Sequence, residues 1–135
     1  MNATLTAFLG FVAWALFLVT LMEFSRFKFI VTGAVPANQF RPDNSNLPPF
    51  MQRLARAHAN CIEGLPIFGG LMLVALLANK SSITDPLAYT LLGARILQSL
   101  IHISSVSVAA SWLRFFAFAV QVAIAVYWAI GLVPA

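Results

Sequence analysis

The sequence predicts an all-α integral membrane protein built as a four-transmembrane-helix bundle. Of its 135 residues, 61% are hydrophobic and only 9% are charged, whereas an ordinary soluble domain is about 25% charged. A soluble fold of this size could not bury so much apolar surface. The apolar residues also fall into four runs, each near the roughly 20 residues that cross a bilayer. The length fits a single domain over residues 1–135.

The four predicted helices are bounded by polar or proline-containing segments. The first run is longer than the apolar part of a signal peptide and follows no basic segment, so it is interpreted as a spanning helix. Pro49 suits the first turn of the second helix, and Asp85 followed by Pro86 predicts an N-cap and a first turn for the third. The predicted helices cover about residues 3–24, 49–78, 86–103 and 112–132.

The connections between these helices predict how the chain lies in the membrane. Four spans place both termini on one side together with the 79–85 turn, and they place the 23–49 and 104–111 connections on the other. The second side carries most of the basic residues, namely Arg26, Lys28, Arg41, Arg53 and Arg56. The positive-inside rule makes that side cytoplasmic. The eight Lys and Arg residues form no dense cluster, so nucleic acid is not an expected partner.

Polar residues inside the second helix are the strongest functional signal. Ionisable groups within a span cost roughly 2.5–3.5 kcal/mol each and usually face a bundle interior or a cavity. Pro66 removes a backbone hydrogen bond and predicts a kink or local adjustment. Four polar side chains are spaced by three, four and three residues, which puts them on one narrow face of the helix: Arg53, Arg56, Asn60 and Glu63.

Two explanations of this face remain open. A buried Arg–Glu network would fasten helices together. The face carries two arginines against one carboxylate, however, and the missing negative charge favours an anionic or zwitterionic ligand. Cys61 is the only cysteine, which excludes an intrachain disulfide and any metal site built from several cysteines, and no metal site is predicted.

The other helices add polar residues at a similar depth. The third helix carries a second, weaker set on one face, namely Arg95, Gln98 and His102. Arg26 leaves the first helix, and Arg114 opens the fourth, at the same side of the membrane. Taken alone, His102 suggests packing and Arg114 suggests an interfacial charge. Their convergence with the second-helix face predicts a polar ligand site near the cytoplasmic side.

Residues 56–66, Arg-Ala-His-Ala-Asn-Cys-Ile-Glu-Gly-Leu-Pro, resemble the second-helix signature of the MAPEG family, the membrane-associated proteins in eicosanoid and glutathione metabolism. The resemblance extends to the four-span layout, the length, Arg95 in the third helix and an arginine that opens the fourth. The chain departs from the family at Gln98, His102 and Gly64, where many members have tyrosines.

This resemblance implies a bacterial-type homotrimer in the inner membrane or an equivalent membrane, with glutathione bound between neighbouring subunits. The implied activity is a glutathione-dependent transferase or peroxidase for hydrophobic small-molecule electrophiles that enter from the lipid. Arg114 would stabilise the glutathione thiolate, and His102 would hydrogen-bond the sulfur or the second substrate. The residues that would bind glutathione, with its two carboxylates and one ammonium, are Arg26, Arg53, Arg56, Asn60, Glu63, Arg95 and Gln98.

Two other functions remain open. A protein of the same fold could bind a lipid or an anionic metabolite without catalysis, and thiol titration with glutathione would distinguish it from an enzyme. A small transporter or channel subunit is less favoured, because the fourth helix and the far halves of the others lack a polar lining.

Overall fold

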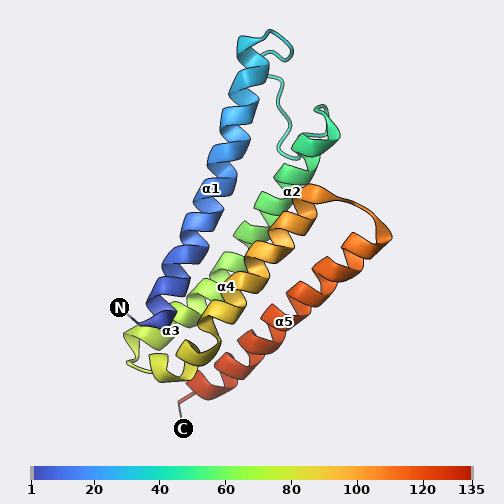
Figure 1. The fold of residues 1–135 in the computed structure, drawn as a ribbon. Helices are drawn as coiled ribbons and strands as arrows, with labels where there is room; N and C mark the ends of the chain where they lie inside the picture. The colour runs from blue at the N-terminus through green and yellow to red at the C-terminus, as the bar shows by residue number, and fades with distance from the viewer. Residues whose placement is uncertain (1, 135) are drawn as a thin grey trace.

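The structure, a computed structural model, describes residues 2–134, and all regular secondary structure in that range is helical. The helices are α1 (Ala3–Val31), α2 (Pro49–Gly64), the π-helical segment η1 (Leu65–Gly69), α3 (Gly70–Leu77), α4 (Ser81–Ser104) and α5 (Val108–Leu132). Because α2, η1 and α3 follow one another without a break, the chain forms four long helical rods (Figure 1).

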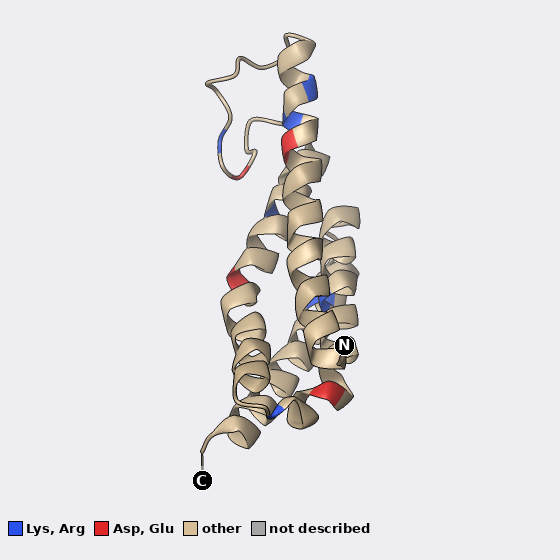
Figure 2. Cartoon of the chain, turned by 90° about the vertical axis from the view of Figure 1, so that its left-hand side faces the viewer, with Lys and Arg blue, Asp and Glu red and all other residues tan. Residues whose placement is uncertain are grey.

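The two ends of the bundle differ in what they carry. Both chain termini and the turn between α3 and α4 lie at one end, and the α1–α2 and α4–α5 connections lie at the other (Figure 1). Most charged residues are found toward the end that carries the 32–48 connection (Figure 2). This arrangement matches the connectivity that the sequence predicts for four spans.

Three of the rods are long and apolar enough to cross a membrane, namely Ala3–Val31, Pro49–Leu77 and Val108–Leu132. The remaining rod, α4, has 24 residues but is not among the helices apolar enough to be candidate membrane spans. Five of its polar side chains are buried, because α4 packs against α1, α2, α3 and α5 and so occupies the centre of the bundle. The buried polar residues of α4 are Thr84, Arg95, Gln98, Ser99 and His102.

The first helix is longer than the sequence predicts. α1 ends at Val31 instead of near residue 24, and Gly33, with a φ of +76°, follows its C-terminus. Glu23 and Arg26 pair across one turn of this helix, with Oε1 and Nη1 3.0 Å apart. The predicted boundary is wrong because the polar residues mark where the apolar run stops and not where the helix stops.

The predicted N-cap at Asp85 is also wrong. α4 begins at Ser81, so Pro86 lies inside the helix. The Asp85 carboxylate instead accepts hydrogen bonds from the Thr4 backbone N–H, at 2.9 Å, and from the Thr4 hydroxyl. Thr4 lies in the first turn of α1, where backbone N–H groups lack intrahelical partners and attract an anion.

The last helix begins earlier than predicted as well. α5 starts at Val108 instead of near residue 112. The Ser107 side chain caps it by accepting from the Ala110 backbone N–H at 3.1 Å, which satisfies one of the free amides of the first turn.

The local adjustment that Pro66 predicts is the π-helical segment η1. A proline removes one helical hydrogen bond, and a wider turn accommodates the loss without ending the helix. Within η1, Phe68 and Gly69 are buried, and the Phe68 ring lies beneath the Arg95 guanidinium at 5.7 Å. The π-helical segment therefore supplies one of the aromatic rings that contact the buried Arg95 guanidinium.

Candidate functional site

A cavity of about 580 Å³ opens at the end of the bundle that carries the α1–α2 and α4–α5 connections. Within the described residues, α5 packs against α4, α3 and η1 but not against α2, which leaves a space between α2 and α5 over the end of α4. Five segments line it: the first connection (residues 32–48, between α1 and α2), α2, the end of α4, the α4–α5 connection and α5. The lining residues are Pro42, Asp43, Ser45, Pro49, Gln52, Arg53, Ala55, Arg56, Ala59, His102, Val106 and Arg114. Ligand cavities typically measure about 300–1,000 Å³.

Arg53 and Arg56 lie one turn apart on α2, and both line this cavity. Arg53 Nε donates to the Ile103 carbonyl at 2.6 Å, which ties α2 to the last turn of α4. Arg56 is exposed and forms no ion pair within residues 2–134. One arginine is thus held by the protein, while the other presents its guanidinium to the cavity.

His102 and Arg114 form a direct pair in the lining of the cavity. Arg114 Nη1 lies 2.8 Å from His102 Nδ1, and Arg114 Nη2 donates to Ser111 Oγ at 2.9 Å. Because a guanidinium does not lose its proton, Nη1 is the donor and Nδ1 the acceptor. The imidazole proton then lies on Nε2, so the histidine offers a hydrogen-bond donor to a ligand and not a base.

One carboxylate completes the cavity lining. Asp43 is exposed in the first connection, and its Oδ1 accepts from the Ser45 backbone N–H at 3.0 Å. This hydrogen bond holds the pKa of Asp43 below its usual value. The lining therefore contains three guanidinium groups, Arg53, Arg56 and Arg114, and one carboxylate. Such an excess of positive charge suits an anionic ligand.

A second polar cluster lies deeper and does not line the cavity. Arg95 Nη1 donates to Asn60 Oδ1 at 2.6 Å, Gln98 Nε2 donates to the same oxygen at 3.2 Å, and Gln121 Nε2 donates to Gln98 Oε1 at 2.8 Å. Arg95 is fully buried, and Phe11 and Phe68 flank its guanidinium at 5.6 and 5.7 Å. Two aromatic rings and the Asn60 amide oxygen therefore stabilise this charge.

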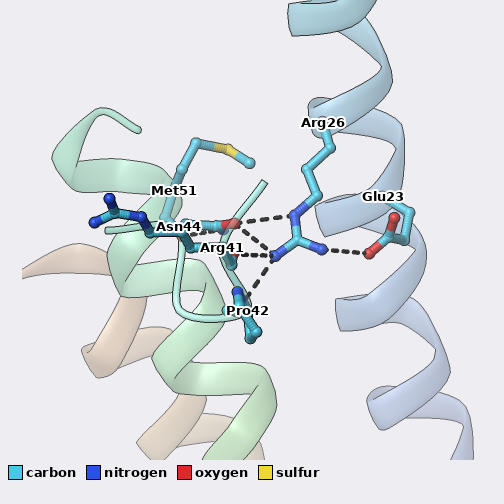
Figure 3. A network of polar contacts seen from close by, with 6 residues as sticks. All are labelled: Glu23, Arg26, Arg41, Pro42, Asn44 and Met51. Atoms are coloured by element: carbon cyan, nitrogen blue, oxygen red, sulfur yellow. Dashed lines mark hydrogen bonds and ion pairs between the residues drawn. The ribbon is translucent and has the colours of Figure 1, made fainter. Parts of the chain in front are cut away.

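The four polar residues of the second-helix face (Arg53, Arg56, Asn60 and Glu63) do not all line the same site in this structure. The first two line the cavity, Asn60 turns into the deeper cluster, and Glu63 is exposed and forms no ion pair within residues 2–134. Arg26 lies outside the cavity and contacts the first connection (Figure 3). Of the nine residues predicted for the site, the structure brings four together around the cavity: Arg53, Arg56, His102 and Arg114.

Gln121 and Asn44 are buried polar residues that the sequence analysis missed. A lone amide within the apolar fourth run is a signal that could have identified Gln121, since polar groups inside a span usually have a partner. Asn44 carries no such signal, because it lies in a connection already rich in polar residues.

Comparison with protein families gives one match. The model of the MAPEG family matches residues 4–133 of the 135-residue chain. Comparisons with curated proteins and with solved structures gave no match.

Proposed function

The chain belongs to the MAPEG family, and from this premise we propose that it is a membrane-bound, glutathione-dependent transferase or peroxidase for hydrophobic electrophiles. Family membership and three apolar helices make it an integral membrane protein. The observation that carries the proposed activity is the cavity of about 580 Å³, in which three arginines and a donor histidine surround one space.

The charge of the cavity suits glutathione. The tripeptide carries two carboxylates and one ammonium, and guanidinium groups bind carboxylates through paired, charge-assisted hydrogen bonds. Arg53 and Arg56 are proposed to bind these carboxylates, and Asp43 is the carboxylate of the lining that could accept from the ammonium. The pair of Arg114 and His102 then faces the thiol.

The proposed mechanism uses this pair to stabilise negative charge on sulfur. A neighbouring guanidinium favours the thiolate over the thiol, and the thiolate is the nucleophile. In transfer, the sulfur attacks an electrophilic carbon, a C–S bond forms, and the leaving group departs with the electrons of its bond. In peroxide reduction, the thiolate attacks one peroxide oxygen, an S–O bond forms as the O–O bond breaks, and the other oxygen takes a proton and leaves as an alcohol. A second glutathione thiol then attacks the sulfur of the resulting sulfenic acid, which forms the disulfide and releases water.

A neighbouring subunit is proposed to complete the site. Arg56 and Glu63 are exposed on the surface of the single chain, and charged groups that face lipid are costly. A homotrimer would cover them and supply partners for bound glutathione. The site end of the bundle is proposed to be cytoplasmic because most basic residues lie there, and cysteine labelling of positions 41 and 80 from opposite sides tests this orientation.

The alternative is a binding protein of the same fold that holds a lipid or an anionic metabolite. The arginine-rich cavity supports anion binding in either case. Incubating the purified protein with glutathione and an activated aryl halide separates the two. Conjugate formation above the uncatalysed rate supports the enzyme, whereas saturable glutathione binding without conjugate or peroxide turnover supports the alternative.

A further inference from the structure

The Arg26 guanidinium makes several hydrogen bonds to the first connection, and each of its nitrogens already donates to a protein oxygen. Nε donates to Asn44 Oδ1 at 2.9 Å, and Nη2 donates to the same oxygen at 2.6 Å and to the carbonyls of Arg41 and Pro42 at 3.1 and 3.3 Å (Figure 3). Nη1 pairs with Glu23. The Phe40 ring covers one face of the guanidinium at 5.7 Å from its centre. All of these partners except Glu23 belong to residues 40–44.

Asn44 continues this contact from α1 to α2. Its side chain is fully buried, and its Nδ2 donates to the Met51 carbonyl in the first turn of α2 at 2.8 Å. Its φ of +57° is a left-handed conformation that asparagine and glycine tolerate better than other residues. Asn44 thus accepts from α1 with one atom and donates to α2 with the other, as Figure 3 shows.

The clamp, the hydrogen-bonded pair of Arg26 and Asn44, lies beside one wall of the cavity. Pro42, Asp43 and Ser45 line the cavity. The Pro42 carbonyl accepts a hydrogen bond from Arg26, and Asp43 and Ser45 are the sequence neighbours of Asn44. Arg26 itself does not line it. We propose that Arg26 and Asn44 are positioning residues that fix residues 42–45 as a wall of the cavity, and that Arg26 does not contact the ligand.

The hydrogen bonds and the burial of the Arg26 side chain support this role over direct contact with the ligand. Each of its three nitrogens already donates to a protein oxygen, and its side chain is only 15% exposed. Arg56, in contrast, is exposed, lines the cavity and forms no ion pair within the described part of the chain. The two arginines therefore differ in function although the sequence suggests the same role for both.

Amide hydrogen exchange on the protein without ligand tests the clamp directly. The Asn44 N–H donates to Arg41 O at 3.0 Å, and the Leu47 N–H donates to Asn44 O at 2.9 Å, so both amides report on the wall. Arg26→Gln and Asn44→Gly should each raise their exchange about tenfold or more, since several hydrogen bonds to a charged group are lost. Glycine keeps the left-handed backbone and removes only the side chain.

Matched variants separate the clamp from general destabilisation. Asn44→Asp keeps an acceptor for Arg26 and should change exchange less than Asn44→Gly. Arg53→Gln removes a cavity arginine that donates to Ile103 and not to the first connection, so exchange at residues 44 and 47 should stay at the parent value. Unchanged exchange in both Arg26→Gln and Asn44→Gly would overturn the proposal.

A double-mutant cycle on glutathione affinity tests the second half of the proposal, which rests on the proposed function. If Arg26 acts through Asn44, the double variant should bind no more weakly than the weaker-binding single variant. If the loss from Arg26→Gln is undiminished in the Asn44→Gly background, Arg26 contacts the ligand and the positioning role is wrong. A parent protein that binds no glutathione contradicts the proposed function, while the exchange measurement still decides the clamp.

Discussion

Arg114 Nη1 lies 2.8 Å from His102 Nδ1, and both side chains line the same cavity. The two residues are twelve positions apart in the sequence and belong to different helices. Since the guanidinium must donate in this bond, the imidazole presents an N–H donor from its other nitrogen. The pair therefore combines a fixed positive charge with a neutral hydrogen-bond donor, as the stabilisation of an anionic sulfur requires.

Arg114→Ala should slow turnover about 100-fold or more while changing glutathione affinity far less, because removing one donor from an anion-stabilising site costs about that much in kcat. Arg114→Lys should recover part of the rate, since a point charge remains while the planar fork is lost. Steady-state kinetics with a model electrophile, beside direct binding of glutathione, measure both effects. Parent-like turnover in Arg114→Ala would mean that the residue is only an interfacial charge.

His102→Ala should reduce turnover less than Arg114→Ala does. The imidazole contributes one neutral donor, whereas the guanidinium contributes the charge. His102→Gln supplies an amide donor at the same position and should lie closer to the parent than the alanine variant. A larger loss in His102→Ala than in Arg114→Ala, measured in the same assay, would show that the histidine carries the chemistry.

Arg56→Ala should weaken glutathione binding by about 1.5–3 kcal/mol, the range for hydrogen bonds to charged groups. Its guanidinium forms no ion pair within residues 2–134, so the fold should not depend on it. Isothermal calorimetry gives the affinity, and a thermal unfolding curve shows whether the protein survives. Lys80→Ala is the control, because Lys80 lies at the other end of the bundle, between α3 and α4. Loss of assembly in Arg56→Ala with unchanged affinity would favour the helix-fastening explanation.

Gly64→Ala should destabilise the protein by about 1–3 kcal/mol, as overpacking of a core does. A Cβ at this position would lie 2.7 Å from Arg95 Nη2 and 3.0 Å from the Phe68 ring. Arg95 cannot move freely because Asn60 accepts from it and two rings flank it. Thermal unfolding in detergent measures the effect. Gly93→Ala is the matched control, since a Cβ at Gly93 would meet no atom within 4 Å.

The sequence was sufficient to predict the helical class, the connectivity and the adjustment at Pro66, because apolar runs and proline act locally. It also predicted that Arg53, Arg56, His102 and Arg114 lie at the same end of the bundle, and in the structure all four line one cavity. Periodicity assigned Asn60 and Glu63 to the same face as the arginines. It could not show which neighbour covers each part of that face, since this depends on how the helices pack.

Tertiary contacts account for the remaining differences. Asp85 resembles a local helix cap in the sequence, but the first turn of α1 competes for its carboxylate. Arg26 resembles a ligand residue, but a buried asparagine eighteen residues later accepts two of its hydrogen bonds. Neither partner is visible in a local pattern, because each comes from a separate element of the fold.

The ionisation state of bound glutathione is the most direct test of the central claim, that the cavity beside Arg114 stabilises a thiolate. The measurement is the ultraviolet difference absorbance of the thiolate, recorded at neutral pH with saturating glutathione, for the parent and for Arg114→Ala. The parent should show thiolate in proportion to occupied sites, and Arg114→Ala should lose most of this signal while still binding glutathione. Bound glutathione that remains a thiol in the parent would contradict the account.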